Sequence, residues 1–190
     1  MIFQEGNKAF GVFCLNEGKV KISKLGSDGK EQIIRLAKPG DTLGYRALMS
    51  DTRYSGSAIA LEGTQVCFIA AEDFNRLLAN NYLIAKDMIK MLSFALGDAE
   101  SALAQLALKP VRERLAEALL LLLKVYGNNE QTPFTISLTR DDLASLVGTA
   151  KETAIRFLSE FKEEGLVTTQ GSAITIIDAD KLLKISHMYD

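Results

Sequence analysis

Near its C-terminus the sequence is predicted to form two short helices separated by one glycine, and this arrangement strongly constrains the fold. Thr139 stands three residues before Asp142, which is the spacing of a capping box at a helix start. Gly148 ends that helix, and Thr149 with Glu152 repeats the capping spacing directly afterwards. Two short helices joined by a glycine-containing turn form a helix-turn-helix.

A β-hairpin is predicted after the second helix, which Gly165 ends. Residues 166–169 and 174–177 are rich in β-branched side chains, and Gln-Gly-Ser at 170–172 supplies a turn between them. Such a hairpin would be the wing of a winged helix-turn-helix domain. We also expect a helix over 110–126, a short strand over 134–137 and a closing helical turn over 180–186.

The second helix is predicted to bury one face and to expose the opposite one. At 100° per residue, one side gathers Ala154, Phe157, Leu158 and Phe161, which we expect to be buried. The residues that lie on the exposed side, on its flank or in the first turn are Thr149, Lys151, Glu152, Thr153, Ile155, Arg156 and Ser159.

These exposed residue types suit the recognition of double-stranded DNA. An arginine such as Arg156 can pair with guanine, a carboxylate such as Glu152 can accept from cytosine, and Ile155 can contact a thymine methyl group. The helix start and small hydroxyl groups suit phosphates. A second interpretation stays open, because Glu152 and Arg156 also have the i,i+4 spacing of a surface ion pair. The two roles are compatible.

The N-terminal part, residues 1–72, is predicted to contain short strands joined by turns. Short apolar or alternating runs lie at 12–15, 20–23, 32–36 and 65–70, with glycine-containing turns between several of them. This spacing favours a barrel, roll or sandwich.

Residues 73–109 change to a helical period without a proline. Packing on its own domain is the simpler role for this helix. An alanine-rich seam also lets two helices approach closely, so we predict a dimerisation helix. Pro110 marks the hinge and the start of a C-terminal domain over 110–190. The seam residues, in alternating steps of four and three, are Met88, Leu92, Ala95, Ala99, Ala102 and Leu106.

Composition narrows the classes of function. The chain has 22 basic and 24 acidic residues, so DNA binding must depend on a local motif. It has one His and two Cys, too few for a multi-histidine metal site or a four-thiolate iron–sulfur cluster, and His187 lies far from the strands that a haem would need. No nucleophile–base pair, signal peptide or membrane span is visible. We therefore expect a cytoplasmic protein that is not an enzyme and holds no metal or cofactor.

Residues 142–156 match the pattern D-L-A-x-x-V-G-x-x-x-E-T-x-x-R, which resembles the helix-turn-helix signature of the CRP/FNR family of bacterial transcription regulators. Segments 17–20 and 29–31 look like the β-roll hairpins of that family, and 39–44 like the start of its ligand cassette. The resemblance implies an α+β fold: a jelly-roll-like β-roll, a long dimerisation helix and a winged helix-turn-helix. It also implies a homodimer on palindromic DNA and contact with RNA polymerase.

The resemblance assigns roles to individual residues of the interface. Glu152 and Arg156 match the base-reading positions, and Thr139 and Arg140 match contacts to the DNA backbone. Lys151 stands where some members have Arg and others an apolar residue.

The effector region departs from the cyclic-nucleotide-binding pattern. Gly44 is followed by Tyr45 instead of the Glu that holds the ribose, and Tyr54-Ser55 replaces the Arg-Ser pair that holds the phosphate. Ala99-Glu100 replaces the purine-contacting Thr-Ser pair. We expect no cyclic nucleotide, and either another small anion or no effector. The candidate pocket residues are Gly44, Tyr45, Arg46, Arg53, Tyr54 and Ser55.

Three further expectations follow. Cys14 and Cys67 lie in apolar runs, so buried thiols without a redox role are the simpler expectation. The family usually has a strand and a short helix before the segment that resembles residues 2–7, which leaves two alternatives open: a chain truncated at its N-terminus, or a start codon assigned too late. The acidic balance of residues 81–190 keeps one alternative function open, a ligand-binding β-roll protein whose helix-turn-helix contacts proteins instead of DNA.

Overall fold

The computed structural model describes residues 1–127 and 132–187. The chain divides into two compact units, one of residues 1–24 and 35–107, the other of residues 25–34 and 108–190. The expected dimerisation segment therefore belongs, up to residue 107, to the same unit as most of the N-terminal strands. Among the described residues no helix has the length and apolarity to cross a membrane, and no cluster of three metal-ligating side chains occurs.

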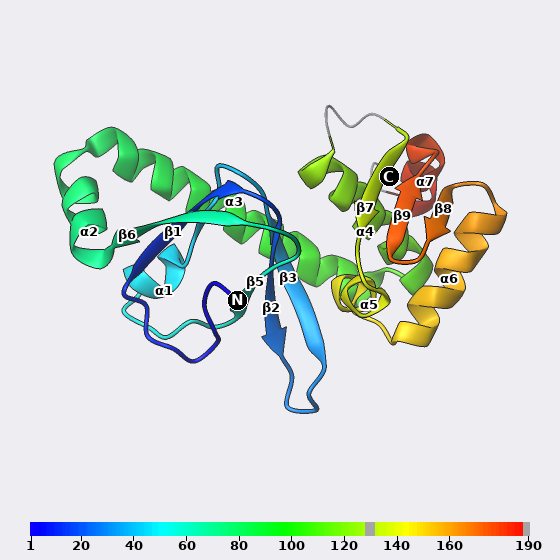
Figure 1. Cartoon of the computed structure of the whole chain (residues 1–190), viewed down its shortest axis with the longest axis horizontal. Coiled ribbons are helices and arrows are strands. Elements are labelled where there is room, and N and C mark those ends of the chain that lie inside the picture. Colours follow the sequence, from blue (N-terminus) through cyan, green and yellow to red (C-terminus); the bar gives the residue numbers. More distant parts are fainter. Residues whose placement is uncertain (128–131, 188–190) are drawn as a thin grey trace. The chain divides into compact units, whose positions relative to one another are not determined.

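The N-terminal strands form a β-roll of two three-stranded antiparallel sheets, in the orders β4-β1-β6 and β3-β2-β5 (Figure 1). Small and branched side chains fill its core, among them Leu15, Val20 and Leu43. The predicted roll is confirmed, although two of its strands, β4 and β5, lie outside the predicted runs. The strands are β1 (Gly11–Glu17), β2 (Val20–Leu25), β3 (Glu31–Ala37), β4 (Thr42–Leu43), β5 (Ser57–Ala60) and β6 (Gln65–Ala70).

Three helices accompany the roll: α1 (Tyr45–Met49), α2 (Ala71–Asn80) and α3 (Tyr82–Leu108). The expected single helical segment is thus two helices. The break is at Asn81, whose Oδ1 accepts hydrogen bonds from the backbone N–H groups of Leu83 and Ile84 and so caps α3. A second core cluster joins the roll to these helices through Val12, Tyr45, Phe74 and Met88.

Where the structure describes it, the second unit contains a three-stranded sheet in the order β7-β9-β8 and four helices. Both helices of the helix-turn-helix contribute to its core, with Leu143, Leu158 and Phe161 fully or almost fully buried. The predicted winged helix-turn-helix is confirmed, including the wing β8-β9 (Figure 1). The elements are α4 (Val111–Tyr126), β7 (Phe134–Ser137), α5 (Arg140–Val147), α6 (Lys151–Glu163), β8 (Val167–Gln170), β9 (Ala173–Ile176) and α7 (Ala179–Ser186).

The helix caps agree with the sequence at α5 and differ at α6. Thr139 Oγ1 accepts the backbone N–H of Asp142 at 3.0 Å, and Gly148 ends α5 with φ of 72°. The second capping box was wrong: α6 begins after Ala150, with no side-chain cap. The reason is that the N–H of Thr149 still bonds to Ala144 O at 3.1 Å, so Thr149 belongs to the turn that closes α5.

Candidate nucleic-acid interface and effector region

The α6 helix buries three of the four side chains predicted to face the core. Ala154, Leu158 and Phe161 are buried, whereas Phe157 is half-buried. The guanidinium of Arg156 lies over the ring of Phe157, 4.4 Å from its centre. Phe157 stands at the edge of the apolar face, where it supports a cation instead of completing the core.

The opposite face of α6 is exposed, and it presents Lys151, Glu152, Ile155, Arg156 and Ser159. Glu152 and Arg156 form no ion pair with each other among the described contacts, so the surface-pair interpretation does not describe this structure. Both charged groups point to solvent in the way that base recognition needs.

Two contacts join the start of α6, the start of α5 and the wing. Lys151 Nζ pairs with Asp141 Oδ2 at 2.8 Å, and Arg140 Nη2 donates to Gly171 O, in the wing turn, at 3.0 Å. Arg140 Nη1 is buried without a described hydrogen-bond partner. The structure thus joins Lys151 of α6 to the start of α5, and Arg140 of α5 to the wing turn. Thr139 is exposed on this side, whereas Thr149 and Thr153 are half-buried.

The wing adds exposed polar residues that the sequence-based prediction did not include. Thr168, Gln170 and Ser172 are exposed, and Ser172 shares a hydrogen bond with Ser137 at 2.8 Å. Uncharged polar side chains in a hairpin have no distinctive pattern, so no local signal could have selected them.

Part of the acidic charge of α6 is neutralised away from the exposed face. Arg112 of α4 pairs with Glu164 Oε1 at 2.6 Å and with Glu160 Oε2 at 3.9 Å. The acidic excess of residues 81–190 was the reason to consider protein contacts as an alternative function. Ion pairs inside this unit neutralise part of that excess.

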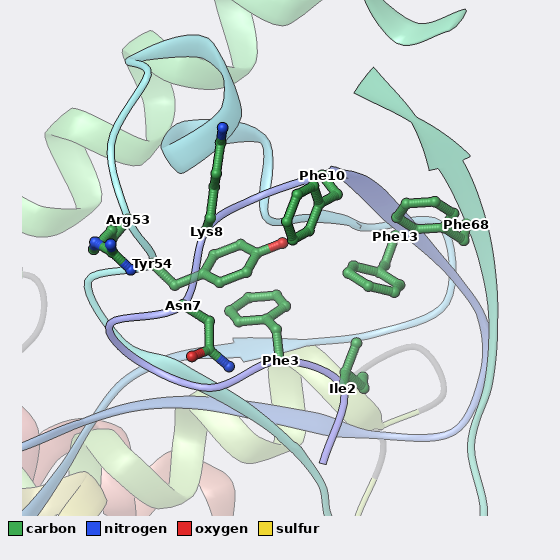
Figure 2. A pocket seen from close by; sticks show the side chains of 9 residues that line it. All are labelled: Ile2, Phe3, Asn7, Lys8, Phe10, Phe13, Arg53, Tyr54 and Phe68. Carbon is green, nitrogen blue, oxygen red and sulfur yellow. The ribbon is translucent and has the colours of Figure 1, made fainter. Parts of the chain in front are cut away.

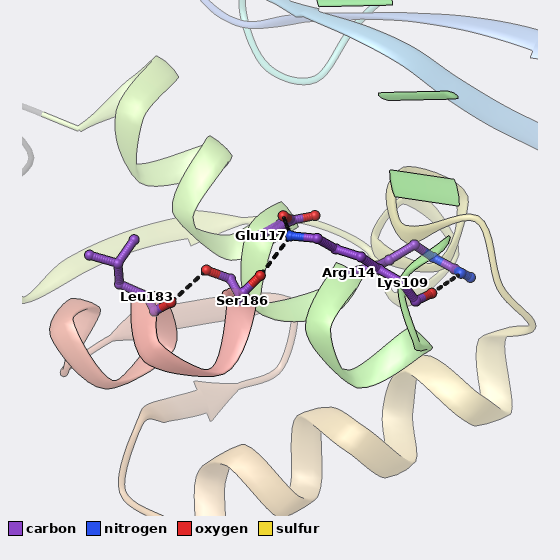
Figure 3. Close-up of polar contacts among 5 residues, drawn as sticks. All are labelled: Lys109, Arg114, Glu117, Leu183 and Ser186. Carbon is purple, nitrogen blue, oxygen red and sulfur yellow. Dashed lines mark hydrogen bonds and ion pairs between the residues drawn. The ribbon is translucent and has the colours of Figure 1, made fainter. Parts of the chain in front are cut away.

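Arg114 of α4 fixes the turn of the helix-turn-helix, and sequence reasoning missed it. Its Nε donates to Val147 O at 3.1 Å and its Nη2 to Gly148 O at 3.1 Å. Its Nη1 donates to Lys109 O at 2.8 Å, so one guanidinium joins the segment before α4 to the turn before α6 (Figure 3). Val147 and Gly148 lie 33 and 34 positions after Arg114 in the sequence, and no local pattern predicts such contacts.

A buried ion pair lies at the same end of α4. Lys109 Nζ contacts Glu117 Oε1, and Glu117 is only 6% exposed. Lys109 Nζ also donates to Ser186 O at 2.7 Å, which attaches the last turn of α7 (Figure 3). The pair is satisfied on both sides, as a buried charge requires.

The exposed apolar surface of α3 differs from the predicted seam. Met88 packs into its own unit with Val12 and Phe74 and is 8% exposed, so it is not available to a partner helix. Leu92 packs partly against the same cluster, Ala95 is half-buried, and Ala99, Ala102 and Leu106 are exposed.

Three large apolar side chains on α3 lie outside the predicted seam: Ile89, Leu96 and Leu103, which are 62 to 70% exposed. They recur every seven residues, which is the heptad period of a helix pair. Ala99 and Leu106 continue the pattern between and after them. The seven-residue spacing of these three large side chains is a signal in the sequence that could have indicated this stripe.

The residues predicted to hold a small anion do not come together in one site. Tyr45 is buried in the core and its Oη accepts from Arg35 Nη1 at 3.3 Å, whereas Arg46 is exposed on α1. Arg53 Nη1 donates to Gly6 O at 2.8 Å. Ser55 is half-buried.

Tyr54 fills the space over the start of α1. Its ring stacks on Phe3, with the centres 4.0 Å apart. A Cβ added to Gly44 would lie 3.2 Å from Tyr54 Cε1, so the ring packs directly over this glycine, whose φ of 82° also favours a residue without a side chain. Burial raises the pKa of the Tyr54 hydroxyl above its ordinary value.

A cavity of about 470 Å³ lies beside Tyr54 (Figure 2). Of the six predicted pocket residues only Arg53 and Tyr54 line it. The other lining residues come mainly from the N-terminal segment and from strands β1 and β6: Ile2, Phe3, Asn7, Lys8, Phe10, Phe13 and Phe68.

Cys14 of β1 and Cys67 of β6 stand opposite each other in the two paired strands. Both are free thiols; Cys14 is half-buried and Cys67 is exposed. The expectation of two buried thiols was therefore wrong for Cys67.

Comparison with known proteins agrees with both units. Residues 1–81 match the family model of the cyclic nucleotide-binding domain, and residues 113–185 match that of the Crp-like helix-turn-helix domain. The Cyclic AMP receptor protein of Thermus thermophilus is 29% identical over 185 residues, which cover 97% of this chain and 83% of that protein. Regulatory protein HlyX of Actinobacillus pleuropneumoniae is 28% identical over 184 residues, covering 96% and 76%.

The solved structure of FixK2 from Bradyrhizobium japonicum superimposes with a TM-score of 0.84 at 26% identity and covers 97% of this chain and 91% of that one. With a cyclic nucleotide-binding domain followed by a Crp-like helix-turn-helix domain, this chain is a transcription regulator of the CRP/FNR family.

Proposed function

We propose that the chain acts as a homodimer that reads a palindromic site on double-stranded DNA, with one α6 helix in the major groove of each half-site. The exposed face of α6 carries this proposal. Glu152, Ile155 and Arg156 face solvent from its first two turns, where a recognition helix contacts base edges. The support of Arg156 by the ring of Phe157 limits the positions of its guanidinium and favours a directed contact.

The phosphate contacts are assigned to the groups around this face. Thr139 and Arg140 lie at the start of α5, and Arg140 is held toward the wing through Gly171 O. Lys151 and Thr153 lie in the first turn of α6, and Thr149 lies in the turn just before it, where backbone N–H groups also favour an anion. Ser159 extends the same face into the third turn. In keeping with such a regulator, the proposal includes a cytoplasmic location and contact with RNA polymerase.

The dimer is supported by the stripe of Ile89, Leu96 and Leu103 on α3. Exposed large apolar side chains at the heptad period are costly in water and are covered when two copies of the helix pack together. Ala99 between them lets the two backbones approach.

The proposed effector is not a cyclic nucleotide. A cyclic phosphate needs a cation and backbone N–H groups in one place, but the ring of Tyr54 covers Gly44 at the start of α1. Tyr45, which follows that glycine, is buried in the core and offers no carboxylate to a ribose. Addition of cyclic AMP should therefore leave the melting temperature unchanged; a rise that depends on concentration would contradict this part of the proposal.

Selection of bound sequences from a random duplex library tests the DNA-reading proposal. The expected result is an enriched palindrome whose half-sites lie about one helical turn apart. Repeating the selection with Arg156→Ala should lose preference at one position of each half-site. Failure to enrich any sequence, with protein that is folded and dimeric, would contradict the proposal and favour protein contacts as the role of the helix-turn-helix.

A further inference from the structure

The cavity beside Tyr54 has one apolar end and one polar end. Figure 2 shows Ile2, Phe13 and Phe68 at one end, and Asn7, Lys8 and Arg53 at the other. The stacked rings of Phe3 and Tyr54 lie between the two ends. Its volume of about 470 Å³ lies within the range of small-molecule sites.

The apolar end is built on a rigid part of the roll. Phe13 of β1 and Phe68 of β6 are directly paired across the two strands, and their ring centres lie 5.1 Å apart. Phe68 is nevertheless 53% exposed, and Phe10 at the rim is 70% exposed. Covering this exposed aromatic surface with an apolar group is favourable, because the surface is then removed from water.

The polar end carries two cations without a carboxylate partner among the described contacts. Lys8 and Arg53 lie opposite each other in an isolated antiparallel bridge, which fixes their backbones. Arg53 uses Nη1 to bond Gly6 O and has further donors available, because a guanidinium has five. Lys8 Nζ lies 6.0 Å from the ring centre of Phe10. Two positive groups at one end of an aromatic cavity favour an anion there.

From this arrangement we propose that the cavity binds a small amphipathic acid, an aromatic or short-chain carboxylate. Its apolar body would lie against Phe13, Phe68 and Tyr54, and its carboxylate would accept hydrogen bonds from Arg53 and Lys8. The inference rests on the proposed role of the first unit as a sensor whose effector is not a cyclic nucleotide. It names the chemical class of that effector.

Displacement of a fluorescent probe tests the proposal on the full-length protein without DNA. Anilinonaphthalene sulfonate, an aromatic anion, should bind with a rise in fluorescence, and phenylbutyrate should displace it. Phenylbutanol, which has the same body and no charge, should displace it about tenfold less well, as expected for the loss of a charge-assisted hydrogen bond.

Variants distinguish this cavity from any other apolar surface. Arg53→Gln and Lys8→Gln, made separately, should each weaken phenylbutyrate binding several-fold and leave phenylbutanol binding unchanged. Phe68→Ser should weaken both ligands. The matched controls are Arg46→Gln, an exposed cation on α1, and Leu77→Ser, an exposed apolar residue on α2, and neither should matter.

Equal displacement by the acid and the alcohol would overturn the proposal, as would equal effects of the cavity and control variants. Selection of DNA sequences without ligand is a separate measurement. A chain that selects DNA but shows no acid binding would fail this inference alone, and the reverse result would fail the proposed DNA reading alone.

Discussion

Arg114 and Gly148 are joined by a hydrogen bond of 3.1 Å from the guanidinium Nη2 to the carbonyl that lies in the turn between α5 and α6. The same guanidinium bonds Lys109 O at 2.8 Å. Since α6 begins three residues after Gly148, Arg114 holds the start of the recognition helix to the segment that precedes α4. Its described partners here are backbone carbonyls, so we treat it as a positioning residue for α6.

Replacement of Arg114 should weaken DNA binding, because the start of α6 would no longer be held in place. Arg114→Met keeps much of the length and removes all donors, so it should lower the free energy of unfolding by about 1–3 kcal/mol. We expect the affinity for the selected site to fall by a larger factor than the affinity for random DNA, measured by fluorescence anisotropy. Arg76→Met, on the exposed surface of α2, is the control. Unchanged discrimination between the two DNAs would refute the positioning role.

The pair of Lys109 and Glu117 should be sensitive to the loss of one partner. Glu117→Ala leaves the ammonium of Lys109 half-compensated in a mostly buried place. The free energy of unfolding should fall by about 3 kcal/mol, measured by urea denaturation. Replacement of both residues, Lys109→Met with Glu117→Leu, should recover most of this loss.

A matched pair nearby provides the contrast. Arg112 and Glu164 are in contact at 2.6 Å, but both side chains are about a third or more exposed. Glu164→Gln should therefore cost under about 1 kcal/mol. Equal costs for the Glu117 and Glu164 variants would show that burial of the first pair has no energetic role.

The stripe on α3 predicts how the dimer can be broken. Leu96→Glu with Leu103→Glu places charges on exposed positions, so the fold of the monomer should be retained while a facing copy is repelled. Sedimentation should then show monomers, and binding to a palindrome should be weak. Ala99→Glu should act in the same direction, whereas Leu77→Glu on α2 should leave the dimer intact. A tight dimer in the double variant would mean that another surface forms the interface.

Tyr54 predicts a pH dependence of the first unit. Burial raises the pKa of this phenol above 10.0 in the folded state, so the folded state holds the proton more tightly than the unfolded chain. The free energy of unfolding should be unaffected by this group below about pH 10 and should fall as the pH rises further. Tyr54→Phe should remove that fall in urea denaturation at alkaline pH. Tyr82→Phe, at an exposed hydroxyl, should keep it, and identical curves for both variants would contradict the assignment.

The parts of the fold that depend on local pattern were predictable from the sequence. Thr139, Gly148 and Gly165 are local signals for helix ends, and all three act as predicted. The exposed face of α6 followed from a simple angular count. The predicted capping role of Thr149 was wrong, because the backbone N–H of Thr149 is used in the turn that closes α5. The capping spacing alone does not reveal this bond.

The parts that depend on contacts between distant segments were not predictable. Whether Met88 packs inside its own unit or faces a partner helix depends on Phe74 and Val12, which lie on other elements. Likewise, Tyr54 reaches Gly44 and Phe3 only through the fold of the roll. The effector region was therefore the least accurate part of the sequence-based prediction.

Base reading by Arg156 of α6 can be measured directly through DNA affinities. The affinities of the wild type, Arg156→Ala and Lys162→Ala should be compared on the selected site and on its single-base variants. Lys162 is exposed on the same helix, near its C-terminal end. We expect Arg156→Ala to lose about 1–3 kcal/mol on the selected site and to tolerate every base at one guanine position, while Lys162→Ala retains full discrimination. An equal loss on all sequences, or an equal effect of the two variants, would contradict base reading by Arg156.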